Sequence, residues 1–159
     1  MKTAIYAGTF DPITNGHLDV LHKSIKLFDK VILGVAEITG KSTTFSTEER
    51  FELCRQATAD MPSVEVQIFD GLVVEFARRI HADVMIRGLR AISDFEYELS
   101  RALMNKKLYG AIETIFFVPE HQYLYLSSTM IREVVQLGGN VHDMIPSCVY
   151  QALKEKYKH

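Results

Sequence analysis

Short apolar runs alternate along the chain with stretches in which apolar residues recur at helical spacing. The first run, Ala4 to Ala7, precedes residues at offsets of three and four that trace one face of a helix: Leu18, Leu21, Ile25 and Phe28. Later runs cover 31–35, 64–69, 84–86 and 115–118. Because strands that alternate with helices form parallel sheets, the pattern predicts a doubly wound α/β fold with five parallel strands.

Capping residues mark several helix starts between these runs. The spacing of a capping box occurs twice, at Ser46 with Glu49 and at Ser93 with Glu96. Asn15 is expected to cap the first helix, and the last helix is expected to follow Pro146. No repeat, low-complexity tract or linker interrupts this order, so residues 1–159 are predicted to form a single domain.

Composition agrees with a compact cytoplasmic protein. The chain has 159 residues, of which 47% are hydrophobic, and this suits one domain with a proper core. A net charge of −2 argues against a general nucleic-acid or membrane surface. No apolar run approaches the roughly 18 residues that would span a bilayer. Cys54 and Cys148 are too few for a disulfide framework or a metal site, so we expect free thiols in a reducing cytosol.

The loop between the first strand and the first helix is predicted to bind phosphate. It runs from Gly8 to His17 and includes Pro12 and Gly16. Unpaired N–H groups and the positive end of the dipole make a helix N-terminus attractive to anions, and His17 adds a donor in the first turn. Neither a P-loop nor a dinucleotide fingerprint is present, so the loop has to be interpreted from its own pattern.

Two later junctions carry groups of the same kind. Arg87 and Arg90 lie at the end of the fourth strand, and the fork of a guanidinium group suits phosphate oxygens. The run 127–129 opens another helix with three hydroxyl side chains. Arg132, in the first turn of that helix, opposes the helix dipole, and a bound anion would explain its position.

These segments resemble known motifs. Thr14 to His17 resembles the T/HxGH motif of the nucleotidyltransferase superfamily, which includes aminoacyl-tRNA synthetases and small adenylyltransferases. Residues 87–98 and 126–133 resemble the RGLRxxxDFEYE and ISSTxxRE segments of the bacterial phosphopantetheine adenylyltransferase family, in the family's order and spacing. Departures from the family pattern are small and fall at Ala7, Ser42 and Leu126.

The resemblance implies a fold and a reaction. The fold would be the Rossmann-like nucleotidyltransferase fold. The reaction would be reversible transfer of the adenylyl group of ATP to 4′-phosphopantetheine, which gives 3′-dephospho-coenzyme A and pyrophosphate in coenzyme A biosynthesis. Attack would be in line and without a covalent intermediate, with Mg²⁺ bound to the ATP rather than to a dedicated protein site. The family is homohexameric, and coenzyme A would act as an inhibitor.

The resemblance also assigns roles to residues. The catalytic residues would be His17, Lys41 and Arg90. The acceptor substrate would contact Thr9, Lys41, Leu72, Val73 and Arg87. ATP would be bound by residues of the first loop, the fourth strand and the segment before the fifth helix: Thr9, Phe10, His17, Gly88, Leu89, Arg90, Glu98, Tyr123, Leu124, Tyr125, Leu126, Ser127, Ser128 and Thr129. A phosphate acceptor is largely dianionic at neutral pH and needs no general base, so cations and N–H donors should dominate the site.

Other interpretations remain open at this point. The arginines could form surface salt bridges, for instance Arg87 or Arg90 with Asp94 or Glu96, and His17 could merely cap its helix. Nicotinate mononucleotide could be the acceptor in the same chemistry. The chain could also be a nucleotide sensor that binds ATP or coenzyme A without turnover.

Overall fold

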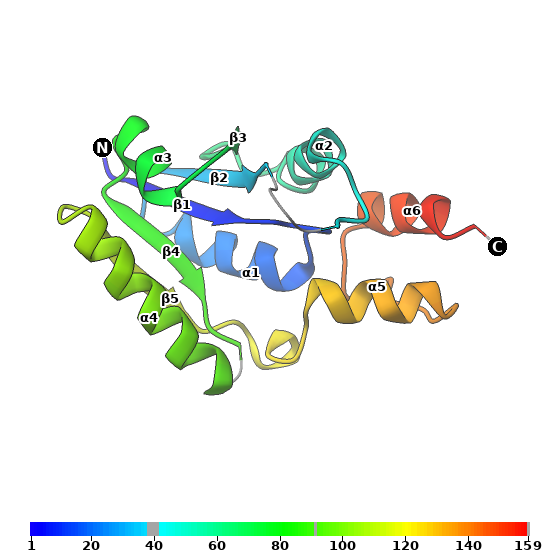
Figure 1. Cartoon of the computed structure of the whole chain (residues 1–159). Helices are drawn as coiled ribbons and strands as arrows, with labels where there is room; N and C mark the ends of the chain where they lie inside the picture. The colour runs from blue at the N-terminus through cyan, green and yellow to red at the C-terminus, as the bar shows by residue number, and fades with distance from the viewer. Residues whose placement is uncertain (38–41, 91, 159) are drawn as a thin grey trace.

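The fold is known from a computed structural model that describes residues 1–37, 42–90 and 92–158 (Figure 1). Five strands form one parallel sheet in the order β3-β2-β1-β4-β5. Their bounds are Thr3–Gly8 for β1, Lys30–Ala36 for β2, Val64–Phe69 for β3, Val84–Gly88 for β4 and Glu113–Phe117 for β5. The predicted doubly wound α/β fold is therefore confirmed, and the strand order reverses beside β1.

Helices connect the strands and extend beyond them at the C-terminal end of the chain. Their bounds are Asn15–Ser24 for α1, Thr47–Ala57 for α2, Val73–Arg79 for α3, Ile92–Leu108 for α4, Ser128–Gln136 for α5 and Ser147–Lys156 for α6, with a short 3-10 helix η1 at His121–Tyr123. In Figure 1, α5 and α6 lie on the side toward which β1 points. No helix in the described parts of the chain is long and apolar enough to cross a membrane.

Two hydrophobic cores cover the two faces of the sheet, and β1 contributes to both. Ala4 and Tyr6 belong to the larger core, which also contains buried residues of α1, α2, α5 and α6. Ile5 and Ala7 belong to the smaller core, which packs against α3. This alternation is the period of two expected of a strand with both faces buried. Because both faces of the sheet are covered and β1 and β4 are parallel neighbours, the loops that follow these two strands lie together at their carboxyl ends.

The helix caps agree with the sequence expectations at some positions and differ at others. Ser46 and Glu49 form the predicted capping box, and α6 begins directly after Pro146. The prediction that Asn15 caps α1 is wrong, because Thr14 is the extended residue whose hydroxyl accepts from the backbone of His17. Helix α4 begins at Ile92, one residue before the predicted cap Ser93, whose side chain lies outside the described residues.

Candidate functional site

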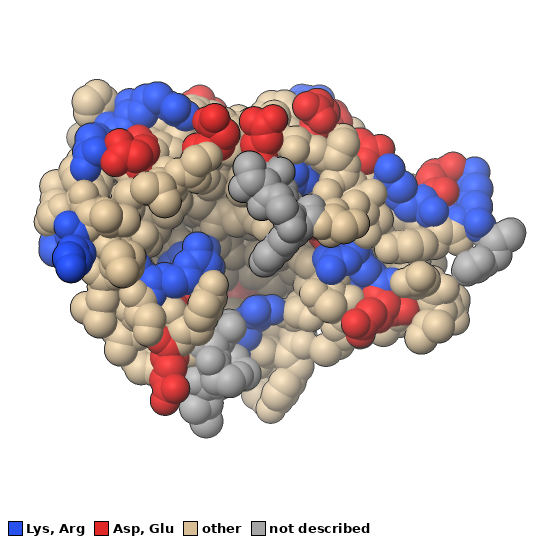
Figure 2. Space-filling view, in the orientation of Figure 1, with Lys and Arg blue, Asp and Glu red and all other residues tan. Residues whose placement is uncertain are grey.

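A cavity of about 440 Å³ opens at the carboxyl ends of β1 and β4, beside the point where the strand order reverses. Figure 2 shows a hollow on this face, with basic side chains close to it. Its lining comes from the loop after β1, the N-terminus of α1, the end of β4, α4, and the segment 119–132. All three sequence motifs therefore contribute to one cavity, as expected for ligands of open parallel sheets.

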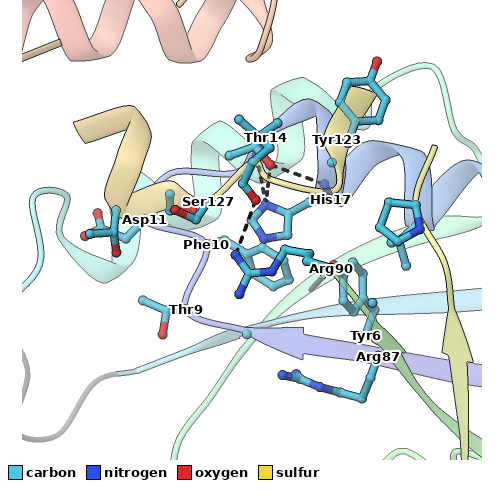
Figure 3. A pocket seen from close by; sticks show the side chains of 18 of the residues that line it. Tyr6, Thr9, Phe10, Asp11, Thr14, His17, Arg87, Arg90, Tyr123 and Ser127 are labelled. Carbon is cyan, nitrogen blue, oxygen red and sulfur yellow. Dashed lines mark hydrogen bonds between the residues drawn. The ribbon is translucent and has the colours of Figure 1, made fainter. Parts of the chain in front are cut away.

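His17 lies at the inner end of this cavity, between Thr14 and Phe10 (Figure 3). The backbone N–H of Thr14 donates to Nδ1 of His17 at 2.9 Å, which closes an unusual capping box with histidine at its third position. Because Nδ1 accepts this bond, the proton of the neutral ring must be on Nε2. The cap therefore selects the tautomer that can donate a hydrogen bond through Nε2.

The surroundings of His17 keep its imidazole neutral. Burial, followed by the nearby positive charges of Arg90 and Arg87, lowers the pKa of His17 from 6.5 to about 3. The ring of Phe10 lies edge-on to the imidazole, with the ring centroids 5.0 Å apart. A neutral imidazole with a fixed tautomer can donate to an anion without a change of protonation state, which is useful where charge develops on a phosphate.

Arg87 is held firmly at the end of β4. Its Nε and Nη2 donate to the two carboxylate oxygens of Glu98 at 2.7 Å each, and its Nη1 donates to the carbonyl oxygen of Ala7 at 2.8 Å. The Glu98 side chain is only 6% exposed. Glu98 is thus a carboxylate partner of Arg87, and this pair is largely buried rather than exposed on the surface.

A second cavity of about 230 Å³ lies on the other side of this ion pair. Both cavities are lined by the end of β1 and by Arg87 and Glu98. The other lining residues of the second cavity are small or apolar side chains together with polar ones from α4 and β5: Ala36, Phe69, Val73, Met85, Arg101, Ala102, Asn105 and Thr114. The site therefore has a polar compartment and a smaller, more apolar one, which meet at Arg87.

Arg90 lies across the mouth of the polar compartment. It is an exposed residue that lines the cavity, and its Nη1 donates to the carbonyl oxygen of Leu126 at 3.3 Å. In Figure 3 its guanidinium group lies next to the rings of Phe10 and His17. Arg90 therefore joins the β4 end to the segment that precedes α5, so two of the three motifs are in direct contact.

The N-terminus of α5 forms the opposite wall. Ser127 caps the helix by accepting from the backbone of Met130, and the hydroxyl of Ser128 donates to the carbonyl oxygen of Pro12 at 2.7 Å. Arg132 donates to the carbonyl oxygen of Asp11, and its Nη1 lies 3.7 Å from the Asp11 carboxylate. A helix N-terminus, two hydroxyls and an arginine thus lie side by side, which is a good environment for an anion.

Asp11 connects this wall to the segment that follows β2. Its two carboxylate oxygens accept from the backbone N–H groups of Thr44 and Phe45 at 2.9 and 3.0 Å, and the residue is 4% exposed. Lys41, the predicted acceptor-side cation, lies outside the described residues. Asp11 nevertheless holds the backbone at Thr44, three residues after Lys41, by accepting a hydrogen bond from its N–H group.

Most of the predicted binding residues line the polar cavity. They are Thr9, Phe10, His17, Arg87, Gly88, Arg90, Glu98, Tyr123, Leu126, Ser127, Ser128 and Thr129. Leu89, Leu124 and Tyr125 are not among its lining residues, and the Tyr125 residue is 76% exposed. Of the two predicted acceptor contacts on α3, Val73 lines the second cavity, whereas Leu72 is 59% exposed and lines neither.

Two residues that hold the site together were not predicted from the sequence. Asp11 lies within the first motif, between Phe10 and Pro12, but a carboxylate in a phosphate-binding loop gave no obvious function. Arg50 is 1% exposed and bonds to the carbonyl oxygen of Thr9. One signal for Arg50 was available: it occupies a helical face with apolar residues three, four and seven positions later, at Leu53, Cys54 and Ala57.

Metal ligands and reactive thiols do not define this site. Among the described residues, no group of three or more His, Cys, Asp or Glu side chains could hold a metal ion. Cys54 and Cys148 are free thiols on α2 and α6. Burial raises the pKa of the Cys54 thiol to about 12, so this side chain behaves as a small apolar core residue.

Comparisons with known proteins identify the family to which the chain belongs. A family model described as cytidylyltransferase-like matches residues 5–134. A phosphopantetheine adenylyltransferase from Moorella thermoacetica is 50% identical over 157 residues, which cover 99% of this chain and 98% of that protein. One from Caldanaerobacter subterraneus subsp. tengcongensis is 47% identical over 158 residues, 99% of each chain.

A solved structure supports the fold independently. The protein is from Vibrio parahaemolyticus and is proposed to be a nicotinate-nucleotide adenylyltransferase. It superposes with a TM-score of 0.73 at 19% identity and covers 100% of this chain and 98% of its own. At that identity the likeness concerns the fold alone. The full-length relatives and the family model show that the chain belongs to the phosphopantetheine adenylyltransferase family of cytidylyltransferase-like proteins.

Proposed function

We propose that this chain, as a single nucleotidyltransferase domain over residues 1–159, transfers the adenylyl group of ATP to 4′-phosphopantetheine. The products are 3′-dephospho-coenzyme A and pyrophosphate. The observation that carries the proposal is the meeting of two compartments at Arg87: one is rich in phosphate-binding groups, and the other is smaller and partly apolar. The names of its full-length relatives point to the same substrates.

The polar compartment suits a reaction between two anions. Arg87, Arg90 and Arg132 line it, and the carboxylates of Glu98 and Asp11 are already engaged with Arg87 and Arg132. The acceptor phosphate is itself a nucleophile, so no residue has to remove a proton. In-line attack on the α-phosphate needs positioning and donors for the developing charge, and Nε2 of His17 would donate there.

The second compartment would hold the uncharged arm of the acceptor. An amide-containing chain needs apolar walls with a few donors and acceptors, and Val73, Met85 and Asn105 line this cavity. With its arm there, the acceptor phosphate would emerge beside Arg87 and face the polar compartment. Coenzyme A carries the same arm and would compete for both compartments, which accounts for its expected role as an inhibitor.

Mg²⁺ would enter with ATP. The only carboxylates on the described cavity lining are Asp11 and Glu98, and both are held by arginines, so the donor set fits a cation bound mainly by triphosphate oxygens and water. Such an ion would neutralise charge on the departing pyrophosphate. No protein residue is assigned to it.

Assembly of several copies, as a homohexamer in the cytoplasm, is part of the proposal. Helix α4 carries large apolar side chains on its exposed surface: Phe95, Tyr97, Leu99, Leu103, Met104 and Leu108. Val118, just after the edge strand β5, is 63% exposed. An apolar surface of this extent favours contact with another protein surface, and a second copy would provide one.

The experiment that tests the function is pyrophosphate release from ATP and Mg²⁺ with 4′-phosphopantetheine, nicotinate mononucleotide or no acceptor. We expect turnover with 4′-phosphopantetheine alone, and a decrease of about 10²- to 10³-fold in kcat for His17→Ala, as for the loss of one transition-state donor. His22→Ala, an exposed histidine on the same helix, is the matched control. Turnover only with nicotinate mononucleotide would change the substrate, and ATP binding without turnover would indicate a sensor.

A further inference from the structure

Arg50 has an unusual environment for an arginine that lines neither compartment of the site. It lies on α2, is 1% exposed, and uses its whole guanidinium group within the protein. Nη1 donates to the carbonyl oxygens of Thr9 at 2.7 Å and Ala36 at 2.9 Å, Nε to that of Phe45 at 3.3 Å, and Nη2 to the hydroxyl of Thr47 at 2.9 Å. One side chain thus ties together the loop after β1, the end of β2 and the start of α2.

Burial of the Arg50 guanidinium group has an unfavourable free energy, which indicates that the group has a role in the structure. Removing a guanidinium group from water is unfavourable, and burial lowers the pKa of Arg50, with the negative charge of Asp11 acting in the opposite direction. An apolar side chain of similar size would suit the core around Leu53 and Cys54 better. What an apolar side chain could not do is hold three carbonyl groups from separate segments in one place.

The carbonyl of Thr9 directly precedes a residue with an unusual backbone conformation. Phe10 has a backbone φ of 49°, in the left-handed region that residues with side chains rarely occupy. Its ring lies edge-on to His17 at 5.0 Å and to Tyr6 at 5.4 Å between centroids. A Cβ atom at Gly8 would lie 3.2 Å from this ring, so the glycine leaves the space that Phe10 fills.

We propose that Arg50 is a positioning residue for His17. By holding the Thr9 carbonyl, Arg50 stabilises the left-handed backbone at Phe10, and the Phe10 ring in turn supports one side of the imidazole. The backbone N–H of Thr14 also fixes the imidazole, through its hydrogen bond to Nδ1. Arg50 contacts no reacting group, and its effect on catalysis rests on the proposed adenylyl transfer.

The test compares Arg50→Lys and Arg50→Met with Arg55→Met as the matched control. Arg55 lies on the same helix, is exposed, and donates only to Glu52 among the hydrogen bonds described for its side chain. We expect kcat to fall about 10- to 100-fold in both Arg50 variants, because a small misplacement of a catalytic group has effects of this size. KM for ATP should stay within about threefold, and Arg55→Met should match wild type.

A spectroscopic measurement on the ligand-free protein separates this role from the reaction itself. The ¹⁵N chemical shifts of the His17 ring report its tautomer, and wild type should show the Nε2–H form alone. Both Arg50 variants should show a mixture of tautomers, since the ring support is loosened. If wild type does not turn over 4′-phosphopantetheine, the proposed function fails, yet these ring shifts still decide whether Arg50 positions His17.

Thr47→Val keeps the test decisive if the Arg50 variants do not fold. This change removes one of the four groups that hold the guanidinium and leaves the charge in place. We expect a mixed His17 tautomer of smaller extent and a decrease of about threefold in kcat. A folded Arg50 variant, or failing that Thr47→Val, with wild-type kcat and wild-type ring shifts would overturn the proposal.

Discussion

Arg87 and Glu98 are joined by two parallel hydrogen bonds of 2.7 Å each, so a strand end and a helix are fastened together at the boundary between the two cavities. The carboxylate is 6% exposed and the guanidinium side chain 21%. Such a pair restricts where the arginine can point. Because its remaining Nη1 bonds to the Ala7 carbonyl, Arg87 is oriented by contacts from both β1 and α4 before any ligand arrives.

Replacing Glu98 by Ala should weaken acceptor binding more than ATP binding. Without its partner, Arg87 loses the fixed orientation that brings it toward the acceptor phosphate, and we expect KM for 4′-phosphopantetheine to rise about tenfold. Removing one member of a buried pair also costs roughly 2–3 kcal/mol of stability here, less than for a fully buried pair because Arg87 keeps some contact with water. Steady-state kinetics and urea unfolding measure the two effects.

Glu96→Ala is the matched control for that change. Glu96 lies on the same helix but is exposed. It should leave both KM values and the unfolding free energy close to wild type. Equal increases in the two KM values for Glu98→Ala would contradict a role on the acceptor side and would favour a contact of Glu98 with the nucleotide.

The partner of Arg87 illustrates what the sequence could and could not predict. Hydrophobic periods and capping boxes are local, so all five strands and the cap at Ser46 followed from them. The choice among several carboxylates in one helix depends on which face of α4 packs on the sheet. Glu98, Arg101 and Asn105 recur at helical offsets of three and four and all line the second cavity.

The cap of α1 illustrates a second limit. Asn15 and Thr14 are both good capping residues, and local propensity ranks asparagine somewhat above threonine, so it favours the residue that does not cap the helix. The structure favours Thr14 because His17, at the third helical position, accepts from the Thr14 backbone in the place usually taken by Glu or Gln.

The contacts of Arg50 could not be predicted from the sequence either. Its partners Thr9 and Ala36 are far from it in sequence and are brought together only by the parallel sheet.

Asp11→Ala should destabilise the protein and disturb the site together. The change leaves the N–H groups of Thr44 and Phe45 without their acceptor, and at roughly 1–3 kcal/mol for each buried donor we expect a loss of about 2–6 kcal/mol. Arg132 also loses its carboxylate partner. Asp11→Asn keeps one acceptor oxygen and should lose about half as much, as measured by urea unfolding. Equal stability of Asp11→Ala and wild type would show that the hydrogen bonds from Thr44 and Phe45 to Asp11 do not contribute to the free energy of unfolding.

His17 should make the stability of the protein depend on pH in the acid range. Its pKa is about 3 in the folded protein and 6.5 in the unfolded chain, so between these values the unfolded chain binds more protons. Stability therefore falls as pH decreases from about 6.5 toward 3, by at most about 1.4 kcal/mol per pH unit from this group, and is insensitive to it above pH 7.

Comparison with His17→Gln isolates that contribution from the carboxylates, which also lose stability in acid. Urea unfolding of both proteins at pH 7, 5.5 and 4.5 gives the difference directly. The stability of wild type relative to His17→Gln should decrease at each step toward lower pH. A constant difference across the three conditions would mean that the folded ring titrates near its ordinary pKa.

Val73 and its neighbour Leu72 offer a test of the second compartment within one dipeptide. Val73 is half-buried and lines the cavity, whereas Leu72 is 59% exposed and lines neither cavity. Val73→Phe adds volume at the wall of a space of only about 230 Å³, so it should obstruct an acceptor arm bound there. We expect KM for 4′-phosphopantetheine to rise about tenfold, which corresponds to about 1.4 kcal/mol, with KM for ATP unchanged.

Leu72→Phe is the control, because it adds similar bulk on the solvent side and should change neither KM value. If Leu72→Phe raised the acceptor KM and Val73→Phe did not, the arm would have to follow the outer surface of α3, and the second cavity would lose its proposed role.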